Sequence, residues 1–221
     1  MRLSSWIAQM TELSRRKADR MIKAGAVKVN GQPAQVGAQI SGDEQIAING
    51  SQIIARTLQL VLLNKPVGYV CSTSRQDSKP TIYELLPDTL HHLSYAGRLD
   101  ADSEGLVILT NNGQLVHELT HPSFEVTRSY QVRLDRPLSA DDLTGLAAGI
   151  ELEDGTSRFD EVSLVSKSNV RVSLHEGRNR QIRRTFNSLG YEVTRLKRTK
   201  HGEYSLGDIP SGKYSLEDIS A

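Results

Sequence analysis

The chain has 221 residues, of which 38% are hydrophobic and 24% charged, a composition typical of a soluble folded protein with one large or two unequal domains. Its net charge of +1 excludes a uniformly basic chain. Basic residues are nevertheless concentrated in two segments: residues 1–58 hold eight basic and four acidic residues, and residues 171–200 hold nine basic and two acidic residues. A single cysteine and the lack of long apolar runs exclude a disulfide framework, a membrane span and a signal peptide. We expect a cytoplasmic monomer that binds no membrane.

The N-terminal residues predict two short helices. Apolar residues recur at helical spacing over residues 3–10. Ser14 is a suitable N-cap for a second helix over residues 15–24, and Gly25 is a suitable end. The second helix has an apolar stripe on one side and basic residues on the other.

Short strands follow these helices, over residues 27–29 and 43–48, each closed by an Asn-Gly turn. Ser14–Ala18 and Val27–Gly31 together resemble the S4-like RNA-binding domain. The alternative is a solvated basic helix face, the usual role of a charge run. The resemblance implies that a set of basic residues binds RNA: Arg15, Arg16, Lys17, Arg20 and Lys28.

A connector over residues 52–58 predicts a domain boundary near Leu58, with domains 1–58 and 59–221. The second domain alternates apolar and polar residues in several short runs, which predict an α+β fold with much antiparallel sheet. The expected strands cover residues 60–65, 107–110, 130–134, 159–165, 170–174 and 193–196. The expected helical segments cover residues 82–86, 115–119, 139–149 and 179–189, and Asn112-Gly113 is expected to form a tight turn.

Asp100 is the first candidate for chemistry, in the run from Gly97 to Leu106. It lies at a turn just before an apolar strand. A catalytic carboxylate needs a guanidinium partner that keeps it ionised and oriented. The partners that the chain offers are Arg98, Arg178, Arg180, Arg183 and Arg184. Asp102 is a rival carboxylate, but its Asp-Ser-Glu-Gly context favours local turn bonding.

The run from Glu176 to Arg184 is the second candidate. Arg180, Arg183 and Arg184 have the spacing of one helix face, and the helix start favours phosphate. A structural basic helix on the surface is the alternative. The histidines lack metal-ligand spacing, so no metal site is expected.

These two runs, with Lys65-Pro66 and Gly68, resemble the RsuA-type ribosomal RNA pseudouridine synthases from about Leu3 to about Leu216. That family uses no cofactor or metal. The resemblance implies that Asp100 is catalytic, that Tyr130 stacks on the target base and that Arg183 pairs with Asp100. It further implies RNA contacts from Lys65, Arg98, Arg178, Asn179, Arg180, Gln181 and Arg184.

The resemblance therefore predicts the conversion of a uridine to pseudouridine in ribosomal RNA, with the base turned out of its stack. The Arg178–Gln181 sequence favours the branch that modifies 23S-type, large-subunit RNA. The residues alone leave two alternative functions open. One is a non-catalytic RNA-binding or ribosome-assembly factor, and the other is the same chemistry on transfer RNA.

Overall fold

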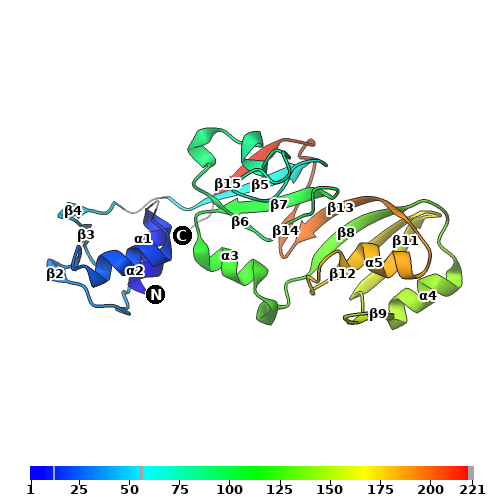
Figure 1. The fold of residues 1–221 in the computed structure, drawn as a ribbon, viewed down its shortest axis with the longest axis horizontal. Helices are drawn as coiled ribbons and strands as arrows, with labels where there is room; N and C mark the ends of the chain where they lie inside the picture. Colours follow the sequence, from blue (N-terminus) through cyan, green and yellow to red (C-terminus); the bar gives the residue numbers. More distant parts are fainter. Residues whose placement is uncertain (12, 55–56, 219–221) are drawn as a thin grey trace.

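The N-terminal residues form a small module of two helices and four short strands (Figure 1). It belongs to a computed structural model that describes residues 1–11, 13–54 and 57–218. The helices are α1 (Leu3–Met10) and α2 (Arg15–Lys23), and the sheet has the order β2-β1-β3-β4. The strands are β1 (Val27–Val29), β2 (Gln32–Pro33), β3 (Ile46–Ile48) and β4 (Ser51–Gln52).

Local signals determine the ends of α2, as the sequence predicted. The Ser14 hydroxyl accepts a hydrogen bond from the Lys17 amide at 3.3 Å, and Gly25 has a φ of +73°. Ala18 and Ile22 face inward and join Leu3, Ile7 and other apolar residues in a core of the module's own. The predicted connector includes residues 55 and 56, which lie outside the described residues.

The rest of the chain is built around a nine-stranded mixed sheet, which confirms the predicted α+β class. Its order is β11-β12-β8-β13-β7-β5-β15, with β14 beside β13 and β6 beside β7. The strands are β5 (Gln59–Lys65), β6 (Ser94–Ala96), β7 (Glu104–Thr110), β8 (Arg128–Leu134), β11 (Glu161–Ser166), β12 (Asn169–Leu174), β13 (Val193–His201), β14 (Tyr204–Ser205) and β15 (Tyr214–Asp218). A separate hairpin comprises β9 (Ile150–Leu152) and β10 (Gly155–Ser157).

Helices cover both faces of this sheet. They are α3 (Gly113–Thr120), α4 (Ala140–Ala148) and α5 (Gln181–Ser188), with 3-10 turns η1 (Ile82–Leu85), η2 (Asp88–Leu90) and η3 (Pro122–Phe124). Alternate residues of β5 and β7 point to opposite faces, so one set packs with η1 and α5 and the other packs with α3. Burial on both faces explains why these two strands are continuous apolar runs.

The pairing of β7 with β13 joins the two halves of the sheet, and it is parallel. Only two register pairs are formed between these strands in the described part of the chain, Glu104 with Lys197 and Gly105 with Arg198. Gly105 has a φ of +105°, and a Cβ there would lie 2.2 Å from the Arg198 carbonyl oxygen. The backbones therefore approach more closely than any other residue at position 105 allows.

Two local predictions are corrected. Asn112-Gly113 is not a tight turn, because the Asn112 side chain caps α3 by accepting hydrogen bonds from the Gln114 and Leu115 amides. The helix expected from Asn179 begins at Gln181, because Arg180 has a left-handed φ of +47°. No described helix has the length and apolarity that crossing a bilayer requires.

Candidate active site

Asp100 lies in a pocket of about 270 Å³ where the two halves of the sheet meet. The loop between β6 and β7 supplies Asp100, β8 supplies Tyr130, and the segment before α5 supplies Arg180. Leu196 and Ile182 form an apolar part of the wall. A second pocket of about 470 Å³ is also lined by Asp100 and Arg180, so Asp100 lines two neighbouring cavities. The structure thus brings together a carboxylate, a tyrosine and an arginine from distant parts of the sequence.

The partner of Asp100 is Arg180, which corrects the predicted pairing with Arg183. The Asp100 carboxylate is 3.6 Å from the Arg180 guanidinium, and this is its only ion pair among the described residues. The Asp100 side chain remains 45% exposed, so it is accessible from the pocket. The long distance is that of a loose pair, which leaves the carboxylate oxygens available for chemistry.

Arg183 instead binds Asp102, for which the sequence predicted only a local role. Its guanidinium donates to the Asp102 carbonyl at 2.9 Å and lies 3.3 Å from the Asp102 carboxylate. A third contact goes to the Val193 carbonyl at 2.7 Å. The turn closed by the Ser103 amide and the Asp100 carbonyl directs Asp102, rather than Asp100, toward α5. Arg183 therefore fixes the loop that carries Asp100.

Asp102 is held by two arginines at once. Arg180 donates to both of its carboxylate oxygens, at 3.2 and 2.8 Å. Partial burial would raise the pKa of Asp102, but the hydrogen bonds from Arg180 and the charge of Arg183 lower the pKa below its usual range. Asp102 is thus ionised and bound by two arginines, whereas Asp100, with a side chain that is equally exposed at 45%, has only the loose contact with Arg180.

Lys65 supports the loop that contains Asp100 and Asp102. It does not reach RNA, which corrects its predicted RNA contact. The side chain is fully buried at the end of β5. Its ammonium donates to the Ser103 carbonyl at 2.6 Å and to the Pro66 carbonyl at 3.0 Å. Burial lowers the pKa of Lys65. A buried lysine bonded to the backbone orders the loop and has no surface to offer a phosphate.

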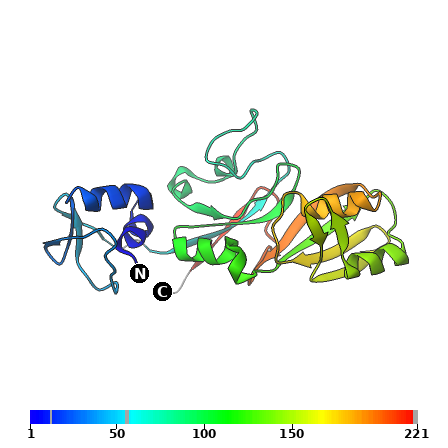
Figure 2. The ribbon, with the colours of Figure 1, turned by 60° about the horizontal axis from the view of Figure 1, so that its bottom comes forward.

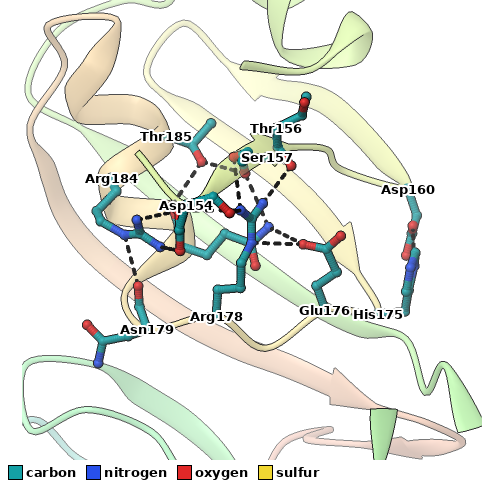
Figure 3. Close-up of polar contacts among 12 residues, drawn as sticks. Asp154, Thr156, Ser157, Asp160, His175, Glu176, Arg178, Asn179, Arg184 and Thr185 are labelled. Carbon is teal, nitrogen blue, oxygen red and sulfur yellow. Dashed lines mark hydrogen bonds and ion pairs between the residues drawn. The ribbon is translucent and has the colours of Figure 1, made fainter. Parts of the chain in front are cut away.

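Arg178 and Arg184 make several contacts within the protein (Figure 3). Arg178 donates to the Gly155 carbonyl at 2.9 Å and to the Thr156 carbonyl at 2.7 Å. Arg184 forms a bidentate ion pair with Asp154, with N···O distances of 2.7 and 2.8 Å. Arg178 contacts the same aspartate at 3.4 Å. These guanidinium groups tie the β9–β10 hairpin to α5 and the segment before it, and the predicted RNA contacts of both arginines stay predictions.

Gln181 is buried, which contradicts its predicted contact with RNA. Its amide nitrogen donates to Glu176 at 3.0 Å and to the Ser157 hydroxyl at 3.2 Å. By contrast, Asn179, Arg180 and Arg98 are exposed and line the pockets around Asp100. For these three residues RNA contact stays a prediction.

Arg198 is a residue of the pocket that the sequence did not single out. It lies on β13, is 2% exposed, and donates to the Leu106 carbonyl at 2.8 Å. One of its guanidinium nitrogens is buried without a partner among the described residues. No local pattern distinguishes Arg198 from its basic neighbours on the strand. Only the pairing of β13 with β7 brings it beneath the loop of Asp100.

The sequence matches two family models. Residues 59–188 match the family described as RNA pseudouridylate synthase, and residues 1–46 match the S4 domain. The chain belongs to the RNA pseudouridylate synthase family. This confirms the resemblance drawn from the motifs.

Individual relatives of the family match nearly the whole chain. "Ribosomal large subunit pseudouridine synthase B" of Xanthomonas campestris is 36% identical over 93% of this chain and 44% of its own length, and its namesake in Bacillus subtilis is 33% identical over 96% and 89%. "Dual-specificity RNA pseudouridine synthase RluF" of Escherichia coli is 35% identical over 96% and 74%. A crystal structure of a pseudouridylate synthase matches 98% of this chain and 96% of its own, with a TM-score of 0.70 and 34% identity. The chain spans less than half the length of the Xanthomonas and Xylella relatives that it matches.

The S4 domain presents the basic residues named from the sequence. Arg15, Arg16, Lys17 and Arg20 of α2 are exposed, and so is Lys28 of β1. Arg15 also lines a cleft of about 1030 Å³ between the S4 domain and α3. The positions suit contact with an RNA backbone, which stays a prediction.

Replacing Asp154 by asparagine tests the attachment of the β9–β10 hairpin. Hydrogen bonding from Arg184 lowers the pKa of Asp154 to about 2, so the pair holds at neutral pH and is lost only as the pH falls from about 4 toward 2. Asp154→Asn releases both arginines and loosens the segment that positions Arg180. We expect a fall of about tenfold in the single-turnover rate of pseudouridine formation.

Glu153→Gln is the matched control for this change. It removes a carboxylate from the same turn, and no ion pair of Glu153 occurs in the described part of the protein. We expect its rate to equal that of the wild type. Equal rates for Asp154→Asn and Glu153→Gln would contradict a positioning role for Asp154.

Proposed function

We propose that this protein converts a uridine to pseudouridine in large-subunit ribosomal RNA. The observation that carries the proposal is the pocket that joins Asp100, Tyr130 and Arg180, in a chain related to enzymes named for this reaction. The reaction breaks the bond between N1 of uracil and C1′ of ribose, forms a bond from C1′ to C5, and moves one proton from C5 to N1. It needs no external oxidant or reductant.

The residues of the pocket suit that sequence of events. Asp100 is the proposed nucleophile or base, since its carboxylate is exposed and paired only loosely. Tyr130 is 9% exposed and lines the same pocket as Asp100, where an aromatic ring is suited to stacking on a uracil. Arg98 is exposed at the mouth of both cavities, where it is suited to holding the nucleotide out of its stack. Arg183, Asp102 and Lys65 are proposed to position Asp100 through the loop.

We also propose that the chain has two domains with a boundary near Leu58 and that it works as a cytoplasmic monomer. Two observations support the boundary. The core of residues 3–46 is separate from the clusters of the large sheet, and the two family matches cover residues 1–46 and 59–188.

Mapping of pseudouridines tests the proposed function. Large-subunit RNA from cells that lack the protein is treated with the purified protein, and pseudouridines are located before and after treatment. We expect one position to be modified only after treatment. Identical maps would refute the proposal, and a new pseudouridine in transfer RNA alone would reassign the substrate.

The exposed cations of α2 are expected to contribute to the salt dependence of RNA binding. Each phosphate contact contributes about 0.7 to 0.9 to the slope of log K against log salt concentration. The double variant Arg15→Ala, Arg16→Ala should therefore reduce that slope by about 1 to 2, measured by fluorescence anisotropy over a range of salt concentrations. Lys167→Ala, an exposed cation on the turn between β11 and β12, is the control and should leave the slope unchanged. An unchanged slope in the double variant would exclude phosphate contacts at α2.

A further inference from the structure

An exposed aromatic cluster lies where α3 ends and η3 begins. The rings of His117 and His121 are stacked, with centroids 4.8 Å apart and planes at 29°. The Phe124 ring meets His117 edge-on at 5.5 Å. All three side chains are exposed, and Phe124 is 46% exposed. We call His117, His121 and Phe124 the aromatic platform.

The fold holds this platform on the surface instead of packing it into a core. The His121 ring nitrogen lies 2.8 Å from the Ser123 hydroxyl, and the Phe124 amide donates to the His121 carbonyl at 3.2 Å. The turn then ends at Glu125, which has a φ of +47°. Phe124 belongs to none of the core clusters formed by the described residues. The Phe124 ring is therefore available to contact another molecule.

The platform lies between the S4 domain and the active pocket. His117 lines the cleft of about 1030 Å³, whose other wall includes Arg2 and Arg15 of the S4 domain. His121 lines a pocket of about 580 Å³ on the other side. That pocket shares Thr120 and Gly177 with the pocket of Asp100. In both ribbon views α3 lies between the S4 domain and the half of the sheet that contains β8 and β12 (Figures 1 and 2).

We propose that the aromatic platform stacks an unpaired base of an RNA strand that runs from the S4 domain to the active pocket. The proposal rests on the proposed function, for which RNA is the substrate. Single-stranded RNA is bound by aromatic rings that stack on its bases beside cations that contact its backbone. Here the cleft with Arg2 and Arg15 supplies the cations, and the platform supplies the rings.

Binding of a labelled oligouridine of about twelve nucleotides tests the platform, with the full-length protein and fluorescence anisotropy. Phe124→Ala should weaken binding about tenfold, since stacking of one base contributes about 1 to 3 kcal/mol. Phe124→Trp keeps a flat ring and should bind as the wild type does. Val165→Ala removes an exposed apolar side chain from the edge strand β11 and should change nothing.

Two comparisons separate stacking from a structural effect. A perfectly paired RNA duplex of the same length has no free base, so Phe124→Ala should leave its affinity unchanged. The urea midpoint of Phe124→Ala should equal that of the wild type, because the ring is outside the core. Any of three results would overturn the proposed stacking by the platform. They are wild-type affinity of Phe124→Ala for the single strand, an equal loss of affinity for the duplex, and failure of Phe124→Trp to restore binding.

The outcomes also distinguish the platform from the proposed function. If the protein makes no pseudouridine but Phe124→Ala weakens single-strand binding, the stacking role of the platform is supported and the proposed enzymatic function is refuted. If the protein makes pseudouridine in large-subunit RNA but Phe124→Ala binds the single strand normally, the proposed enzymatic function is supported and the stacking role of the platform is refuted.

Discussion

Replacing Asp100 by asparagine is expected to abolish pseudouridine formation and to leave RNA binding intact. Asparagine has the same shape but no charge and no basic oxygen, so it serves neither as nucleophile nor as base. Loss of such a group lowers rates by about 10⁴-fold or more. The fold should persist, because Asp100 is 45% exposed and its single ion pair is long. The measurement is the single-turnover rate on large-subunit RNA, alongside the Kd for the same RNA.

Asp102→Asn is the matched control for Asp100→Asn, since the two carboxylates lie on the same loop and share Arg180. Its loss weakens the contacts that Arg180 and Arg183 make with the loop but leaves the Asp100 carboxylate in place. We expect a fall of about 10²-fold, typical of a misplaced catalytic group. Equal residual rates in the two variants would refute the assignment of Asp100 as the reacting carboxylate.

Replacing Gly105 by alanine is expected to destabilise the protein by about 3 kcal/mol or more, because overpacking and a positive φ at a residue with a Cβ both add strain. The added Cβ would lie 2.2 Å from the Arg198 carbonyl oxygen and 2.7 Å from its amide nitrogen. Both are backbone atoms of β13, so the strand itself must move. Urea unfolding followed by circular dichroism measures the loss.

Gly113→Ala provides the comparison for Gly105→Ala. Gly113 is the first residue of α3, and a Cβ there meets no atom within 4 Å. Alanine in a compatible helical position should raise stability by up to about 1 kcal/mol. If both variants unfolded at the same urea concentration, the close approach of β7 and β13 would not be a source of stability.

The parts of the fold that the sequence predicted are those governed by nearby residues. Ser14 and Gly25 mark the ends of α2 through bonds and backbone angles within a few residues. Ser139 caps α4 by the same local chemistry. Asn112 shows the limit of this reasoning, because asparagine suits both a turn and a helix cap, and the sequence does not separate the two.

The sequence named residues that the structure brings into one pocket, but it assigned the arginine pairing wrongly. Asp100 and Tyr130 share a pocket as expected, but Asp102 took the arginine that had been assigned to Asp100. Those partners are 81 residues apart, so their pairing depends on the folded chain. Asp154, in an unremarkable surface turn, gave no signal that it would occupy Arg184.

Burial explains the remaining differences. The resemblance implied that Lys65 and Gln181 contact RNA, and lysine and glutamine are usually exposed. Each is instead buried with its polar atoms bonded to protein groups, Lys65 to two carbonyls and Gln181 to Glu176 and Ser157. Such a position depends on backbone groups that only the folded chain brings into reach.

The parallel seam between β7 and β13 also determines when, during folding, the protein acquires its active pocket. Asp100 lies on one side of the seam, whereas Tyr130 and Arg180 lie on the other. The hydrogen bond from Arg198 to Leu106 across it joins residues 92 positions apart, and contacts that close such long loops are slow to form. A chain whose two half-sheets are complete but not yet joined has every catalytic side chain and no pocket. The rate at which activity recovers after dilution from denaturant therefore measures the rate at which the two halves of the sheet join.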